Sequence, residues 1–280
     1  MANPFYDPGE QRAAKVQDLF GAIAPRYDLL NDLQSFGLHR YWKRRVVRLA
    51  RPRPGERALD LCCGTGDLAL ALARRGVEVV GMDFSERMLA LAEARKSKAP
   101  VPRIKSQIPG ETGEGPGAGG KYAPEQRFSS TAPRPSAFCA PPRYVRGDAL
   151  QAPFRDDSFD LVVVGYGLRN LSSWEAGLRE MQRVTRAGGR LLVLDFCKPD
   201  NALWRSLYFG YLRLCVPWLG RVFAGSAGAY AYILESLRHY PAQHAVATKM
   251  KELGLVGLRT VQLLGGVMSI NYAEKAPLTE

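Results

Sequence analysis

The sequence predicts an α/β protein with a doubly wound, mostly parallel sheet, and three observations lead to this prediction. Short apolar runs alternate with helical segments over most of the chain. A glycine turn at residues 64–66 directly follows the apolar run 59–61. The next apolar run, 77–82, ends in Asp83. A strand, a glycine turn, a helix and a second strand ending in an acid are typical of folds that bind an adenosine-containing ligand.

The first half of the predicted sheet follows from these apolar runs. We expect strands at 59–61 and 77–82, with a helix over 68–75 between them. A short strand at 143–146 comes next along the sheet-forming part of the chain. Residues 159–164 form an unbroken apolar run, which is typical of a parallel strand covered on both faces.

The second half is predicted in the same way. Residues 174–185 are amphipathic, and we expect a helix that ends at the glycine pair 188–189, because glycine favours helix C-termini. A buried strand is expected at 191–196. Residues 257–263 and 267–272 then read as a strand pair that closes the sheet.

The chain is expected to form one domain from residues 1–97 and 143–280. Within it we expect a helical lid at 1–53 and a helical insertion at 201–240, before the last two strands, that caps a substrate. Residues 98–142 hold nine of the 19 prolines and six of the 28 glycines, so this insertion is predicted to be disordered.

Composition narrows the possible functions. The chain has 280 residues, 46% of them apolar, and a net charge of +12. Its apolar runs are too short to span a bilayer, and the N-terminus lacks a secretory core or the features of a transit peptide. Five cysteines without framework or zinc spacing suit a reducing compartment, and no metal is expected. The basic segment 40–53 could meet an anionic surface or be the solvated face of a helix.

The residue after the glycine turn favours S-adenosylmethionine over NAD. A pyrophosphate would sit at the helix N-terminus, where Asp67 would repel it. A cationic sulfonium tolerates an acidic pocket. We therefore expect S-adenosylmethionine as the cofactor, with contacts from Asp60, Gly64, Thr65, Gly66, Asp83, Phe84, Asp148, Ala149 and Gly165. Asp83 would take the ribose hydroxyls and Asp148 the adenine amino group.

Three motifs resemble a known family, the C-methyltransferases of ubiquinone and menaquinone biosynthesis. The first motif begins at Tyr27-Asp28 and continues through Leu30-Asn31 and Ser35 to His39 and Trp42. The second runs from Arg183 to Phe196, and the third is Gly167-Leu168-Arg169-Asn170. The resemblance covers nearly the whole chain apart from the insertion.

Within this family the chain looks most similar to the cyanobacterial and plastid branch, which methylates 2-phytyl-1,4-naphthoquinol, the precursor of phylloquinol. Residues 60–64, 82–85, 165–167 and 229–233 are similar to that branch. The tail at 269–275 departs from the bacterial pattern, and Thr185 and Ala187 depart from the second motif.

The resemblance implies a class I S-adenosylmethionine-dependent methyltransferase with a Rossmann-like, seven-stranded sheet. It implies C-methylation of a prenylated or phytylated quinol by Arg169, Asn170, Tyr27 and His39, with Arg169 stabilising the phenolate. A membrane-soluble substrate implies peripheral membrane binding through 40–53 and 203–224, and a homodimer or a quinone-synthesis complex is possible. The plastid branch implies a chloroplast location, and otherwise the cytoplasmic face of a membrane.

Four alternatives stay open at this point. The substrate could be a demethylmenaquinol or a benzoquinol precursor of ubiquinone. A nucleic-acid methyltransferase would share the fold and the basic charge, but residues 165–168 lack the (Asn/Asp)-Pro-Pro-aromatic turn of amino-directed enzymes, and we expect no nucleic-acid partner. A non-catalytic assembly subunit and another small-molecule methyltransferase are the remaining two.

Overall fold

The computed structural model describes residues 7, 9, 11–98, 140–224 and 227–277. Most of the predicted insertion, residues 99–139, lies outside this part of the chain, so its predicted disorder stays a prediction. The helices are α1 (Arg12–Ile23), α2 (Tyr27–Ser35), α3 (Leu38–Ala50), α4 (Asp67–Ala73), α5 (Glu86–Lys98), α6 (Trp174–Val184), α7 (Ala202–Ala224), α8 (Ala227–His239) and α9 (Ala242–Glu252). Three short 3₁₀ turns are η1 (Ala24–Arg26), η2 (Leu168–Asn170) and η3 (Leu264–Gly266).

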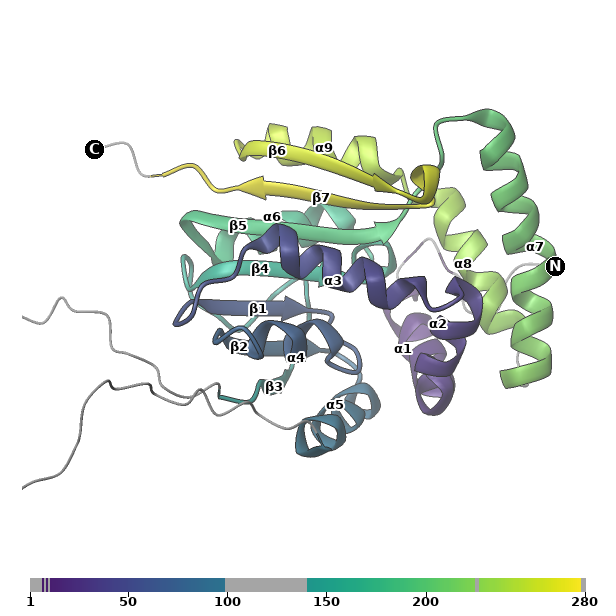
Figure 1. The fold of residues 1–280 in the computed structure, drawn as a ribbon, viewed down its shortest axis with the longest axis horizontal. Coiled ribbons are helices and arrows are strands. Elements are labelled where there is room, and N and C mark those ends of the chain that lie inside the picture. The colour runs from purple at the N-terminus through teal and green to yellow at the C-terminus, as the bar shows by residue number, and fades with distance from the viewer. Residues whose placement is uncertain (1–6, 8, 10, 99–139, 225–226, 278–280) are drawn as a thin grey trace, which may run out of the picture.

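One seven-stranded sheet forms the centre of the fold (Figure 1). The strands are β1 (Arg57–Leu61), β2 (Glu78–Asp83), β3 (Arg143–Arg146), β4 (Phe159–Gly165), β5 (Thr185–Phe196), β6 (Val256–Leu263) and β7 (Met268–Glu274). Their order is β3-β2-β1-β4-β5-β7-β6. Strands β1 to β5 are parallel, and β7 is antiparallel to both of its neighbours. The predicted fold class, a mostly parallel sheet closed by a strand pair, is confirmed.

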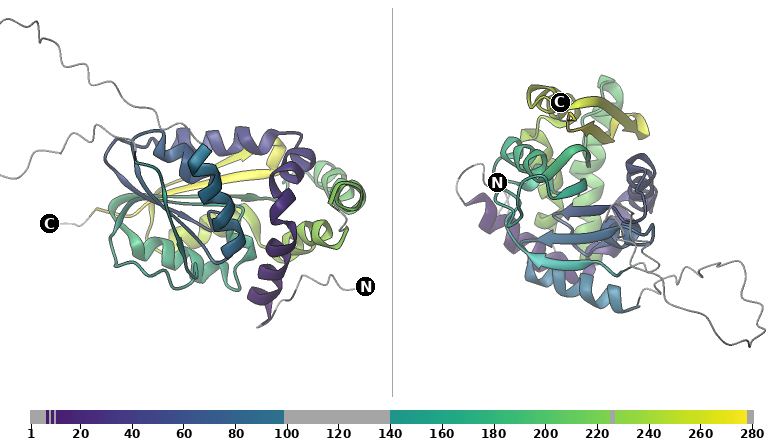
Figure 2. Two further views of the ribbon diagram at one scale, coloured as in Figure 1. Left: turned by 90° about the horizontal axis from the view of Figure 1, so that it is seen from below. Right: turned by 90° about the vertical axis from the view of Figure 1, so that its left-hand side faces the viewer.

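Helices cover both faces of the sheet, as Figures 1 and 2 show. Helices α3, α4 and α5 lie on one face, and α6 and α9 lie on the other. Helix α3 presents Trp42, Val46 and Val47 to the core, while Arg44 and Arg48 face solvent. The basic segment is therefore a packed amphipathic helix, and α3 belongs to the layer on the sheet. Helices α1, α2, α7 and α8 lie beyond the carboxyl ends of the parallel strands (Figure 1).

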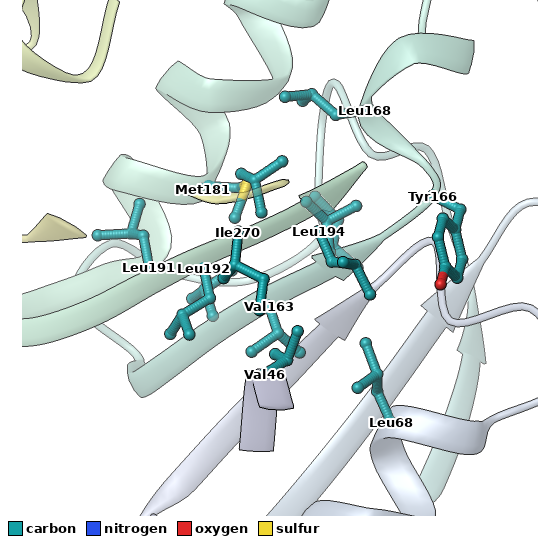
Figure 3. Close-up of a cluster of buried hydrophobic side chains, with 14 of the residues drawn as sticks. Val46, Leu68, Val163, Tyr166, Leu168, Met181, Leu191, Leu192, Leu194 and Ile270 are labelled. Carbon is teal, nitrogen blue, oxygen red and sulfur yellow. The ribbon is translucent and has the colours of Figure 1, made fainter. Parts of the chain in front are cut away.

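The core lies between these layers. Val163 and Leu192, on the central strands β4 and β5, are fully buried. Figure 3 shows side chains of these strands between Val46 of α3 and Met181 of α6. Burial on both faces explains why the strands read as unbroken apolar runs.

One predicted boundary is wrong. Helix α6 ends at Val184, and the glycine pair 188–189 lies inside β5 rather than at a helix end. The pairing of β4 with β5 is irregular between Phe159 and Leu161. A Cβ on Gly189 would lie 2.8 Å from the Arg186 carbonyl oxygen. The two glycines thus allow an irregularity in the sheet. In the sequence, a glycine pair at such a position resembles the signal that marks a helix C-terminus.

Candidate functional site

The glycine turn after β1 is held in a conformation that only glycine adopts easily. Gly64 and Gly66 have φ of 54° and 81°. A Cβ on Gly66 would lie 2.2 Å from the Tyr144 hydroxyl oxygen, so this position has no room for a side chain. The Gly64 amide donates a hydrogen bond of 2.8 Å to Asp83, which ties the turn to the end of β2. The predicted pairing of glycine turn and acid is therefore present.

A cavity of about 220 Å³ opens in front of this turn. Six of the predicted cofactor residues line it: Gly64, Asp83, Phe84, Asp148, Ala149 and Gly165. Helix α1 contributes Val16 and Phe20, which the sequence alone did not indicate. The cavity thus lies at the carboxyl ends of β1, β2 and β4, where ligands bind in open α/β sheets.

Asp83 lines the cavity with both oxygens already anchored. Its Oδ2 accepts from the Gly64 amide and its Oδ1 accepts from the Ser85 amide at 2.9 Å. Burial raises the pKa of Asp83, and the backbone hydrogen bonds oppose that shift. Asp148 is held in the same way, because its Oδ1 accepts from the Leu150 amide at 2.9 Å. Each carboxylate oxygen has a second lone pair, which leaves capacity for ligand hydroxyl or amino groups.

Asp60 and Thr65 lie behind the turn, in a smaller cavity beside Asp67. Asp60 accepts from the Ala69 amide at 2.9 Å, and its Oδ1 has no partner among the described residues. Burial raises the pKa of Asp60 to about 7. Its role in the structure is to fix the first turn of α4, and Gly66 lines neither this cavity nor the larger one.

A polar network joins the N-terminal helices to the turn. Arg95 of α5 pairs with Asp28 of α2, and it donates to Asp67 at 2.6 Å and to Thr65 at 3.0 Å. The Thr65 hydroxyl donates to Asp28 at 3.2 Å, and Lys43 binds Asp67 at 2.6 Å. Although burial opposes it, the two cations lower the pKa of Asp67. Sequence reasoning missed this network because its members come from four helices and the glycine turn.

A second cavity adjoins the first on the side of α2 and α3. The two cavities share the side chains of Phe20, Tyr27 and Tyr166. Five buried polar atoms on side chains lining the second cavity have no hydrogen-bond partner among the described residues: Asn31 Nδ2, Gln34 Oε1, His39 Nδ1, Tyr166 Oη and Arg169 Nε. Buried polar atoms are normally paired, so this cluster indicates a place for a ligand that carries both donors and acceptors.

Arg169 is held by a buried ion pair. Its Nη1 donates to Asp195 at 2.7 Å and to the Tyr166 carbonyl at 2.9 Å, and its backbone amide donates to Asp195 at 3.0 Å. Although burial opposes the charge, Asp195 raises the pKa of Arg169. The pairing of Asp195 with Arg169 was not predicted from the sequence. The Nε of Arg169 is buried without a partner among the described residues, so it can donate to a ligand.

The remaining predicted catalytic residues surround the boundary between the cavities. Tyr27 lines both, Asn170 lines the first, and His39 lines the second. Asn170 accepts from the Tyr232 hydroxyl at 3.1 Å and donates to the Tyr166 carbonyl at 2.9 Å. Tyr232, on α8, fixes the orientation of Asn170 and was not predicted.

The residues of the first cavity fit S-adenosylmethionine. A Cβ added to Gly64 would have no other atom within 4 Å, so the backbone of Gly64 faces open space. The cavity combines apolar side chains with two acids, which suits an adenosine ring, a ribose and a cation. In the described ranges no cluster of His, Cys, Asp or Glu could hold a metal ion. Over the same ranges, no helix is long and apolar enough to cross a membrane.

Two solved structures with the same fold are described as methyltransferases. A putative S-adenosylmethionine-dependent methyltransferase from Methanococcus maripaludis matches with a TM-score of 0.54 at 16% identity, covering 92% of this chain and 93% of that one. A methyltransferase from Thermotoga maritima, described as a possible histamine N-methyltransferase, matches with a TM-score of 0.56 at 16% identity, covering 92% and 99%. These similarities show the fold.

Sequence comparisons identify the family. A demethylmenaquinone methyltransferase from Desulfitobacterium hafniense is 36% identical over 95% of this chain and 92% of its own. Another, from Mycolicibacterium paratuberculosis, is 34% identical over 94% of both chains. The model of the ubiE/COQ5 methyltransferase family matches residues 8–109 and 137–275, which leaves out only the centre of the insertion and the chain ends. The chain is therefore an S-adenosylmethionine-dependent methyltransferase that belongs to the ubiE/COQ5 methyltransferase family.

Proposed function

We propose that this enzyme methylates a ring carbon of a prenylated naphthoquinol, with a demethylmenaquinol as its substrate. The observation that supports this best is the pair of joined cavities, one suited to the methyl donor and one to a hydroxylated ring. They meet at Phe20, Tyr27 and Tyr166, so a ring in the second cavity would lie beside a donor in the first.

The donor would occupy the first cavity. Asp83 would hold its ribose and Asp148 its adenine amino group, with Phe84 and Ala149 beside the base. When bound, S-adenosylmethionine supplies an electrophilic methyl group on a sulfonium. The residues around it position the reacting atoms rather than take part in a covalent step.

The ring would occupy the second cavity as the reduced quinol, because a quinone ring is too electron-poor to attack a methyl group. Loss of a phenolic proton moves charge onto the ring carbon, and the Arg169 guanidinium can stabilise that charge through Nε. Asn31 Nδ2 adds a neutral donor on the same cavity. Tyr27 and Asn170, at the boundary, would orient the ring towards the donor.

The relatives favour the demethylmenaquinol alternative over the phylloquinol precursor. Relatives that align with more than nine-tenths of this chain are named demethylmenaquinone methyltransferases. The similarity to the plastid branch rests on short segments such as 60–64 and 229–233. Both substrates are naphthoquinols that differ in the tail. The chloroplast location depends on the plastid branch and stays a prediction.

A membrane surface is the proposed partner, because the substrate tail is insoluble in water. An open apolar groove of about 580 Å³ lies between α2 and α7. Its Phe36, Leu214 and Trp218 side chains are 79%, 70% and 61% exposed. On α3, which contacts α2, Arg44 and Arg48 add an exposed positive charge one helical turn apart. Exposed apolar side chains together with exposed arginines favour an anionic lipid surface.

Product analysis with methyl-labelled donor tests the proposed function. Wild-type protein would be incubated without oxygen with a reduced demethylmenaquinol, reduced 2-phytyl-1,4-naphthoquinone, a benzoquinol precursor of ubiquinone, and transfer RNA. We expect label in the naphthoquinols, most rapidly in demethylmenaquinol. Label in the RNA, or in no quinol, would contradict the proposal.

A further inference from the structure

The second cavity contains a histidine whose two ring nitrogens have different environments. His39, at the start of α3, is buried with 4% exposure. Its Nε2 lies 2.7 Å from Asp32 Oδ1, and its Nδ1 is a buried atom without a partner among the described residues. The same ring lines the cavity that contains Arg169 and Tyr27.

The hydrogen bond to Asp32 fixes the tautomer. Hydrogen bonds from His39 and Arg40 outweigh the effect of burial and lower the pKa of Asp32, so its carboxylate is ionised. An ionised carboxylate can only accept a hydrogen bond, so His39 Nε2 must carry the proton. In the neutral imidazole the Nδ1 lone pair is then free to accept one.

We propose that His39 Nδ1 accepts the proton from the ring hydroxyl, with Asp32 as the residue that positions and stabilises the imidazole. This inference rests on the proposed function and adds a proton acceptor to it. The Asp32 side chain is 29% exposed, and its carboxylate faces Nε2, where it can orient the imidazole as a base. Arg169, on the same cavity, stabilises the negative oxygen that remains.

The proposed reaction transfers one proton to His39 and one methyl group to the ring. The hydroxyl proton moves to Nδ1, and its O–H electron pair is delocalised into the ring. The ring carbon then uses an electron pair to form the new bond to the methyl group, while the S–CH₃ pair returns to sulfur and leaves a neutral thioether. Loss of the proton from the methylated carbon restores the aromatic ring as a phenolate. Nδ1 then returns its proton to the phenolate oxygen, so the product is the quinol and one proton is released to solvent for each methyl group transferred.

The charges around His39 are consistent with a neutral base. Burial lowers the pKa of His39, and its hydrogen bond to Asp32 opposes that shift. The titratable and charged groups near it are Asp32 and Tyr27 of α2, Arg40 and Lys43 of α3, Asp67 of α4, and Arg169 of η2, with Tyr166 and Tyr232 on the same cavity. The α1 side chains on this cavity, Leu19, Phe20 and Ile23, do not titrate.

A pH profile with paired variants tests the inference. We expect His39→Gln to lower kcat roughly 100-fold or more, the usual contribution of a general base, with unchanged affinity for S-adenosylhomocysteine by calorimetry. In wild type, kcat should rise with pH as His39 loses its proton. Asp32→Asn should lower kcat and shift this rise to lower pH, because the carboxylate no longer stabilises the imidazolium. An unchanged kcat in His39→Gln would overturn the inference.

A matched control is present on the surface. His244 of α9 forms a similar pair with Asp200, at 2.8 Å, but its side chain is 71% exposed. His244→Gln should leave kcat and its pH profile as in wild type. If His244→Gln lowers kcat as much as His39→Gln does, the effect is not specific to His39 and the inference fails.

Nitrogen NMR of the wild-type protein tests the tautomer without a variant. The chain has only three histidines, so the ¹⁵N spectrum of the imidazoles is simple. We expect His39 as the Nε2-protonated tautomer, and its Nδ1 signal should move when a 1-naphthol with a prenyl tail is added with S-adenosylhomocysteine. Protonation at Nδ1, or an Nδ1 signal that does not move, would overturn the inference. If either of these NMR results is found and the wild-type enzyme still methylates quinols, the proposed function stands and only the role of His39 is overturned. If the wild-type enzyme methylates no quinol, both the proposed function and the role of His39 are overturned.

Discussion

Two residues that line the first cavity have a strained backbone. Cys62 and Tyr166 have φ of 55° and 64°, a region that side chains other than glycine rarely occupy. Each such residue costs on the order of 1 kcal/mol, and the neighbouring structure must hold it. Gly167 is packed against Cys62, because an added Cβ would lie 2.5 Å from the Cys62 Cβ. Both strained residues therefore lie at the proposed donor site.

Asp83 offers the sharpest test of the donor site at this scale. In Asp83→Asn the new amide group cannot accept from both the Gly64 and Ser85 amides, so the glycine turn loses an anchor and the ribose loses an acceptor. We expect the Kd for S-adenosylhomocysteine to rise roughly tenfold to 100-fold, as for the loss of one or two hydrogen bonds to a charged group. Calorimetry measures this.

Asp156→Asn is the matched control, because Asp156 is an exposed acid on a turn outside both cavities. The Kd of Asp156→Asn for S-adenosylhomocysteine should equal that of wild type. An Asp83→Asn variant that folds and binds the donor product as tightly as this control would exclude Asp83 from the ribose site.

Asp60 predicts a pH dependence of stability. Its pKa is raised from 3.8 to about 7 in the folded state, so between these values the folded protein keeps a proton that the unfolded chain has lost. Raising the pH through this window therefore lowers the stability that Asp60 contributes. Asp60→Asn cannot titrate, and we expect its free energy of unfolding to improve relative to wild type between about pH 5 and about pH 8. Urea denaturation at both pH values measures the difference.

The exposed Asp18 on α1 gives the control for this comparison. Asp18→Asn should show the same pH dependence as wild type. If Asp60→Asn instead loses stability relative to wild type as the pH rises, the direction of the Asp60 shift is wrong.

At the scale of elements, the sequence predicted strands better than the contacts between helices. The run 159–164 is a strand in the structure because a buried parallel strand needs a continuous apolar run, and 143–146 forms the edge strand β3 as predicted. The end of α6 was misplaced because glycines serve both helix ends and irregular strands. The Arg169–Asp195 pair joins positions 26 residues apart, and no local pattern marks such a contact.

The network around Arg95 predicts coupling between α2 and the donor site. Arg95→Gln would remove the guanidinium that bridges Asp28 of α2 and Asp67, so the hydrogen bond from Thr65 would be left to link Asp28 to the glycine turn. We expect faster amide hydrogen exchange in α1 and α2, and a roughly fivefold rise in the Kd for S-adenosylhomocysteine, as for about 1 kcal/mol from a half-exposed ion-pair network. Exchange mass spectrometry and calorimetry measure these changes.

Arg146→Gln controls for the loss of a charge, since Arg146 forms an exposed pair with Glu86. The rate of amide hydrogen exchange in α1 and α2 of Arg146→Gln should equal that of wild type. Equal exchange in Arg95→Gln and Arg146→Gln would show that Arg95 does not hold the N-terminal helices.

For the whole molecule, the sheet and the donor cavity followed from the sequence, and the ring cavity followed only in part. Tyr27, His39 and Arg169 were predicted from the family resemblance, and the structure brings them to one cavity. Their partners were not predicted, because Asp32 and Asp195 become neighbours of these residues only when the helices pack around the carboxyl end of the sheet.

The apolar groove predicts how the whole protein meets a membrane. We expect wild type to float with vesicles that contain phosphatidylglycerol at low salt and to be released at high salt, because exposed charges are screened. Replacing both Phe36 and Trp218 by serine should lower the bound fraction severalfold, since each removes an exposed apolar side chain. Sedimentation through sucrose separates bound from free protein.

Val256→Ser removes an exposed apolar residue from β6, in a different part of the fold from the groove. Its flotation should equal that of wild type. Equal flotation of the double variant and this control, or none in wild type, would contradict the proposed membrane surface.

We propose that the donor and the ring occupy the two joined cavities. A crystal structure of the enzyme with both ligands bound would show whether they do. The complex would contain S-adenosylhomocysteine and a reduced demethylmenaquinol, which cannot react with each other. We predict the ribose hydroxyls on Asp83 and the ring between Tyr27, His39 and Arg169, with a ring hydroxyl on His39 Nδ1. A ring bound outside the second cavity, or a ribose away from Asp83, would contradict this account.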